Sequence, residues 1–177
     1  ASNNNVITGE IGTVNLSLDV TKVLPNTTSV DNILVTSFNE LSSNLNNKCL
    51  YTDGELATCQ LYKIVLTNNA DGVNTKVVGS VSFNNATSPN LSWIKLDNYD
   101  ASTTYTASSI GGDKHKASST FTNFSNAYLL KKSNSVTYYL LVWVDESEDE
   151  QTDDGSFTGT VRFEDENGKG VTSTFGA

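Results

Sequence analysis

The residues of this chain that could do chemistry are few, and its only histidine is the first to consider. His115 lies in the polar run Asp113-Lys114-His115-Lys116. A serine triad needs a histidine poised by a carboxylate, and the metalloprotease helix motif needs two histidines. A lone histidine beside two lysines satisfies neither requirement, so we expect His115 to be an exposed loop residue. The sequence therefore predicts a protein that is not an enzyme.

An acidic stretch from residue 145 to residue 155 is the second chemical feature. Carboxylates supply the hard oxygen ligands that calcium prefers. Their spacing does not match an EF-hand, and a run of like charges is usually a solvated loop. A calcium site and a solvated loop both stay open as interpretations, and we expect no other cofactor. The candidate ligands are Asp145, Glu146, Asp149, Asp153 and Asp154.

The third feature is a pair of cysteines, Cys49 and Cys59, which are the only two in the chain. A Thr-Asp-Gly turn between them would bring the thiols close, and an even count in an extracellular setting favours a disulfide. Two reduced thiols are the alternative. A zinc site would need more nitrogen and sulfur ligands than one histidine can add. We therefore expect a disulfide and an exported protein.

The overall composition excludes several classes of partner. The chain has 177 residues, a formal net charge of −9 and a single arginine, Arg162. Such a surface repels nucleic acid and anionic lipid, so neither is an expected partner. No apolar run is long enough to cross a bilayer, so we expect no membrane insertion of the mature form. There is no methionine, and we expect that a signal peptide was removed before Ala1.

Two predicted strands frame the acidic stretch. The run from Val136 to Val144 is almost continuously apolar, which suits a strand buried on both faces. The segment from Ser156 to Phe163 alternates strictly, which suits a strand with one face in a core and the other in water. A turn at Gly168-Lys169-Gly170 would let Val171 to Phe175 pair with this second strand. The inward side of the strand from Ser156 to Phe163 comprises Phe157, Gly159, Val161 and Phe163.

Further strands are predicted upstream, where apolar residues alternate with polar ones. We expect the segments Cys59 to Thr67 and Thr75 to Phe83 to form a hairpin. We expect Ala127 to Leu130 to form another hairpin with the apolar run from Val136 to Val144. The segments are Thr13 to Val20, Cys59 to Thr67, Thr75 to Phe83 and Leu91 to Leu96.

One segment has a helical pattern instead. From Ser29 to Leu45 the apolar residues recur at spacings of three and four, and a strand from Ile33 to Phe38 is the alternative. The sequence thus predicts an all-β fold with at most one or two short helices. We expect an antiparallel β-sandwich of jelly-roll or immunoglobulin-like type. The predicted core residues are Leu16, Leu18, Tyr62, Ile64, Leu66, Leu140, Val142, Val161 and Phe163.

Three aromatic residues allow two interpretations. Trp93, Tyr99 and Tyr105 could form a sugar-binding platform, or they could pack in the core. Core packing is the expectation, because large aromatic side chains bury more apolar area than they expose.

Both ends of the chain resemble one known family. An apolar strand with a tryptophan, an acidic loop with a glutamine and a Phe-x-Gly strand are similar to the C-terminal part of the TasA/camelysin group. Those are secreted, fibre-forming proteins of Gram-positive bacteria. Thr8-Gly9, before an alternating strand, resembles the mature N-terminus of the group. The matching C-terminal residues are Trp143, Asp145, Gln151, Phe157, Gly159 and Val161.

The resemblance implies a structural subunit of an extracellular filament, with copies of itself as partners. Residues 1–12 would be an extended donor strand that pairs with the neighbouring subunit, and residues 13–177 would be a single sandwich domain. The protein would be secreted, in the extracellular space or at the cell surface. A monomeric cell-surface adhesin or carbohydrate-binding module is the alternative. The residues expected at the subunit interface are Asn5, Val6, Ile7 and Ile11.

Overall fold

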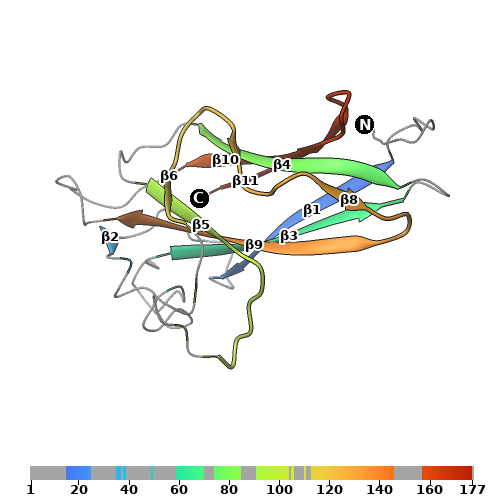
Figure 1. Cartoon of the computed structure of the whole chain (residues 1–177). Coiled ribbons are helices and arrows are strands. Elements are labelled where there is room, and N and C mark those ends of the chain that lie inside the picture. Colours follow the sequence, from blue (N-terminus) through green and yellow to red (C-terminus); the bar gives the residue numbers. More distant parts are fainter. Residues whose placement is uncertain are drawn as a thin grey trace.

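The fold is an all-β sandwich of two sheets packed face to face (Figure 1). The computed structural model describes residues 15–24, 35–36, 59–69, 74–84, 91–103, 113–145 and 157–176, together with Phe38, Cys49, Tyr105 and Ile110. This arrangement confirms the predicted fold class. The strands are β1 (Leu16–Leu24), β2 (Val35–Thr36), β3 (Cys59–Asn68), β4 (Thr75–Asn84), β5 (Leu91–Leu96), β6 (His115–Lys116), β7 (Thr122–Asn123), β8 (Tyr128–Leu130), β9 (Ser135–Asp145), β10 (Thr158–Glu164) and β11 (Gly170–Gly176).

The first sheet has the order β1-β3-β9-β5-β6, and the short strand β2 also pairs with β9. All its pairs are antiparallel except β2 with β9, which is parallel. The second sheet has the order β11-β10-β4-β7, and β8 pairs with β4. Strand β9 therefore lies in the middle of the first sheet, as its apolar sequence predicted. Within β9, residues 140–145 are buried while residues 136–139 are half-buried, so burial on both faces holds only for its second half.

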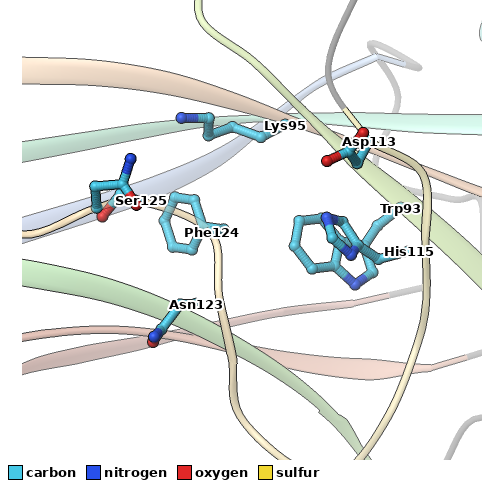
Figure 2. Close-up of a pocket in the computed structure, with 8 residues that line it drawn as sticks. Trp93, Lys95, Asp113, His115, Asn123, Phe124 and Ser125 are labelled. Carbon is cyan, nitrogen blue, oxygen red and sulfur yellow. The ribbon is translucent and has the colours of Figure 1, made fainter.

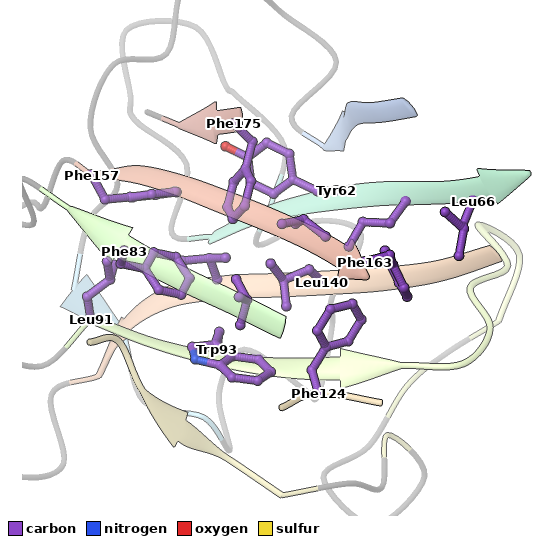
Figure 3. Close-up of a cluster of buried hydrophobic side chains, with 14 of the residues drawn as sticks. Tyr62, Leu66, Phe83, Leu91, Trp93, Phe124, Leu140, Phe157, Phe163 and Phe175 are labelled. Atoms are coloured by element: carbon purple, nitrogen blue, oxygen red, sulfur yellow. The ribbon is translucent and has the colours of Figure 1, made fainter. Parts of the chain in front are cut away.

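The main core lies between the two sheets (Figure 3). Seven of the nine predicted core residues are buried there, and Leu16 and Leu18 are only half-buried. Their strand, β1, is the last in its sheet, so no strand of the described residues covers them on the outer side. The seven are Tyr62, Ile64, Leu66, Leu140, Val142, Val161 and Phe163.

A second apolar cluster covers the opposite face of the first sheet. Leu61, Leu141 and Trp143 point to that face, and the ring of Phe38 stacks on Trp143 with centroids 5.2 Å apart. The cluster also contains the predicted Cys49–Cys59 disulfide, whose Cα atoms are 4.7 Å apart. A disulfide indicates an oxidising environment such as the cell exterior. No helix among the described residues has the length and apolar character needed to cross a membrane.

The predicted C-terminal pairing is present, because β10 and β11 form an antiparallel hairpin. Its turn contains Gly168 at φ 81°, a backbone conformation that glycine adopts without strain. The Asp165 carboxylate accepts hydrogen bonds from the backbone N–H groups of Asn167 and Lys169. Arg162 donates to the carbonyl oxygen of Gly168, so the only arginine of the chain also holds this turn.

Two of the predicted hairpins are wrong. Strands β3 and β4 are neighbours in the chain, but β3 belongs to the first sheet and β4 to the second. The reason lies in their outer faces: β3 carries apolar side chains on both faces, whereas β4 presents Lys76 and other polar residues to solvent. Similarly, β8 pairs with β4 rather than with β9, so the turn after it connects the two sheets.

The predicted helix from Ser29 to Leu45 is wrong at two positions, because Val35 and Thr36 form strand β2. These two residues agree with the alternative strand from Ile33 to Phe38. Phe38 is helical, which agrees with the predicted helix, and the rest of that segment lies outside the described residues. Residues 1–12 also lie outside the described residues.

Candidate functional site

The sandwich has one side on which both sheets end in a long edge strand. We call this the open side and define it by β1 and β11, which lie alongside each other. Among the described residues, no strand pairs with the outer edge of β11 or with that of β1 from Leu16 to Thr21. The inward side chains of Leu16, Leu18 and Val20 pack on the core but are only half-buried. An edge of this kind can accept a further strand.

A buried tyrosine connects the two sheets at the open side. Tyr62 of β3 donates a hydrogen bond to the carbonyl oxygen of Gly176 at the end of β11, over 3.1 Å. Its hydroxyl also bonds to the Gln60 side chain, and its ring lies 4.6 Å from that of Phe175. Burial raises the pKa of Tyr62 well above its usual range. The phenol therefore stays neutral and holds β11 in place beside β1.

The opposite side of the sandwich is covered by residues 113–130, which we call the closing segment (Figure 1). It begins on the first sheet as β6 and continues to the second sheet as β7 and β8. Between these short strands its backbone bonds to both sheets: Ala117 N–H donates to Leu91 O over 2.7 Å, and Phe83 N–H donates to Ser118 O over 2.7 Å. The closing segment thus leaves the two sides of the sandwich unequal: among the described strands, two long edge strands lie together on the open side alone.

The closing segment borders a pocket with a volume of about 290 Å³. Trp93 and Lys95 of β5 form its floor together with His115 of β6. Figure 2 shows His115 lying against Trp93, with Phe124 on the other side of the space. The His115 and Trp93 ring centroids are 4.4 Å apart and their planes differ by 26°. The residues that line the pocket are Trp93, Lys95, Asp113, His115, Asn123, Phe124, Ser125 and Asn126.

The polar groups of this pocket are held in place by neighbours. The Lys95 ammonium lies 3.4 Å from the Asp97 carboxylate and 5.0 Å from the centre of the Tyr138 ring. Ser125 is buried, and its Oγ accepts a hydrogen bond from Gly79 N–H over 2.8 Å. The pocket can therefore offer both donors and acceptors, and at least Lys95 and Ser125 have defined neighbours.

The acidic stretch is only partly described. Asp145 ends strand β9 and is 1% exposed, and its carboxylate forms an ion pair with Lys114 over 2.6 Å. The other four candidate calcium ligands, Glu146, Asp149, Asp153 and Asp154, lie outside the described residues. Within the described ranges no group of three His, Cys, Asp or Glu side chains could hold a metal ion. The calcium site stays a prediction.

The candidate interface residues Asn5, Val6, Ile7 and Ile11 also lie outside the described residues, so their role stays a prediction. The three aromatic residues of the suggested sugar platform do not lie together. Trp93 faces the main core, whereas Tyr99 and Tyr105 stack with centroids 5.9 Å apart in the cluster on the opposite face of the sheet.

His115 is not the exposed loop residue that the sequence predicted, because it is half-buried in β6 and stacked on Trp93. Two residues of strand give no periodic pattern, so sequence reasoning missed this pair. The only available signal was that Trp93 and Lys95 share one side of the alternating segment from Leu91 to Leu96.

We compared the chain with known families and with curated proteins, and neither a family profile nor a curated protein matches it. The similarity to the TasA/camelysin group therefore rests on the quoted residues alone and stays a prediction.

Proposed function

We propose that this chain is the structural subunit of an extracellular filament. Subunits would assemble head-to-tail, each donating residues 1–12 as an extra strand to its neighbour. The protein would be secreted and would act without catalysis. A head-to-tail contact of this kind repeats without closing and so produces a fibre.

The observation that carries the proposal is the open side of the sandwich. Two long edge strands, β1 and β11, lie alongside each other there, whereas the closing segment occupies the other side. The half-buried Leu16, Leu18 and Val20 offer apolar surface next to an edge that could pair with an added strand. Edge strands left in this state invite pairing with another chain, and donated strands use that property.

The energy of such a contact would come from a few groups. Val6 and Ile7 are the only apolar side chains among residues 1–8 apart from Ala1. Full burial of two aliphatic side chains contributes roughly 3–6 kcal/mol, and each new backbone hydrogen bond adds about 1 kcal/mol. A loss of about 3 kcal/mol weakens association roughly 100-fold, which is enough to prevent polymerisation at ordinary concentrations.

Removal of residues 1–7 tests the proposal directly. We expect the truncated chain to stay folded, with an unchanged melting temperature, because the described residues from Leu16 onward already build the two apolar clusters. It should sediment as a monomer and show no fibres by negative-stain electron microscopy. A synthetic peptide of residues 1–7 should also inhibit assembly of the full chain.

A pair of matched variants separates side-chain burial from the presence of the segment. Val6→Ser with Ile7→Ser should abolish assembly, whereas Asn3→Ser with Asn4→Ser should leave it intact. Normal filaments from the truncated chain would refute strand donation. A structure with Val6 and Ile7 packed inside their own subunit would refute it as well.

A further inference from the structure

The pocket beside the closing segment has chemistry that strand donation does not use. It lies at the side of the sandwich away from β1 and β11, and its lining combines rings with polar side chains (Figure 2). We propose that this pocket binds a single neutral sugar ring of a glycan. The proposal goes beyond the filament, because it applies whether or not the chain polymerises.

The size of the pocket favours one small ring. Ligand pockets usually range from roughly 300 to 1,000 Å³ and are mostly apolar. A volume of about 290 Å³ lies at the lower end of this range, and six of the eight lining residues are polar or charged. A compact ligand with many hydroxyl groups fits such a lining better than an apolar molecule does.

The rings and polar groups are arranged as a sugar ring requires. The half-buried His115 imidazole, which stacks on Trp93, offers a ring surface to the pocket, and Phe124, which is 7% exposed, lies across the space from it. Carbon-bound hydrogens of a sugar can pack on such surfaces. Lys95 offers donors, Asp113 offers acceptors, and the amides of Asn123 and Asn126 offer both. Hydroxyl groups, which are donors and acceptors at once, are complementary to this set.

The charges favour a neutral ligand over an anion. The pocket has one lysine and one aspartate, and the Lys95 ammonium already lies 3.4 Å from Asp97 outside it. The whole chain has a net charge of −9, so a phosphate or a carboxylate would approach against the overall field.

The pocket wall is held in position before any ligand arrives. Lys114, between the two lining residues Asp113 and His115, forms an ion pair with the buried Asp145 over 2.6 Å. In the same segment, the backbone of His115 pairs with that of Trp93. A site fixed in this way loses little conformational entropy on binding.

The two tryptophans of the chain give a direct test. Trp93 lines the pocket, whereas Trp143 is buried in the cluster on the opposite face of the first sheet. The ¹⁵N-labelled full chain would be titrated separately with glucose, galactose, mannose and N-acetylglucosamine, each to about 100 mM, and Trp93→Phe would assign the two indole N–H signals. For a ligand of this size we expect a dissociation constant on the order of 1 mM. At least one sugar should shift the Trp93 signal saturably and leave Trp143 unmoved.

Exposed residues provide the variants, because replacing them should not unfold the chain. Asn126→Ala and Asp113→Asn should each weaken binding by about fivefold or more, and Asn134→Ala, in an exposed turn outside the pocket, should not change it. The proposal is overturned if none of the four sugars shifts the Trp93 signal. It is equally overturned if the Trp143 signal shifts as much as the Trp93 signal. It is also overturned if Asn126→Ala and Asp113→Asn bind the sugar as tightly as the Asn134→Ala control does.

Discussion

Replacement of Gly159 by alanine should destabilise the sandwich, and the structure shows why. Gly159 in β10 is paired directly with Phe175 in β11. A Cβ atom added at residue 159 would lie closer than 3.0 Å to three atoms of the Phe175 ring. The ring would have to move out of a cluster in which it lies 4.6 Å from Tyr62 and 5.8 Å from Phe83.

The size of the effect follows from two opposing contributions. Forcing an extra methyl group into a packed core costs about 1–3 kcal/mol. Alanine gains roughly 0.5–1 kcal/mol over glycine in a strand, because the unfolded chain has less backbone freedom to lose. Because three ring atoms would lie closer than 3.0 Å, the cost should fall in the upper half of its range, so we predict a free energy of unfolding lower by about 1–2 kcal/mol. In a chain of this length that corresponds to a melting temperature lower by roughly 2–8 °C.

Urea denaturation of a double-mutant cycle measures this effect. Phe175→Leu shortens the side chain that the new methyl group meets, so Gly159→Ala should cost at least 0.5 kcal/mol less in its presence. Thr158→Ala, at an exposed position of the same strand, should change stability by less than about 0.5 kcal/mol. If Gly159→Ala is as stable as the parent chain, or if the two substitutions are additive, the β10–β11 register described here is wrong.

Four other outcomes are expected. Leu140→Ala should lower the free energy of unfolding by about 2–5 kcal/mol in chemical denaturation, because Leu140 is 1% exposed in the main core; a cost below 1 kcal/mol would contradict its placement. Reduction of the Cys49–Cys59 disulfide should raise the intact mass by about 2 Da and remove roughly 2.5–3 kcal/mol of stability, whereas a native chain whose thiols are both alkylated would exclude the bond. The free energy of unfolding should fall above about pH 10, because the unfolded chain ionises its tyrosines there while the folded chain keeps Tyr62 protonated. Tyr62 contributes a slope of up to about 1.4 kcal/mol per pH unit, so the slope should be smaller in Tyr62→Phe. If the acidic loop holds calcium, excess chelator should lower the melting temperature, and an unchanged melting curve would favour a solvated loop.

Strand positions were predictable from the sequence because they depend on local patterns. The apolar run ending at Val144 and the alternation around Val161 each predicted a strand, and both strands are present. Strand pairing was less predictable, since it depends on which surfaces the rest of the chain can cover. The predicted β3–β4 hairpin was wrong for this reason. The outer face of β3 carries Leu61, which packs in the second apolar cluster, whereas the outer face of β4 carries the exposed Lys76.

The candidate sites were predictable to different degrees. The Cys49–Cys59 bond could be predicted because the two residues are near each other in the chain. The sequence predicted that Asp145 belongs to the acidic loop. In the structure it ends strand β9 and forms an ion pair with Lys114, 31 residues earlier in the chain. The contact between Trp93 and His115 depends on a two-residue strand, which leaves no periodic signal. Long-range contacts of this kind arise from the packed fold rather than from any local sequence pattern.

The most direct test of the central claim is negative-stain electron microscopy of the purified full chain under non-denaturing conditions. We predict fibres built from a regular repeat of single sandwich domains, each joined to the next by the donated N-terminal segment. Discrete particles of the size of one domain, at concentrations where the chain is folded, would contradict the proposed filament and favour a monomeric adhesin.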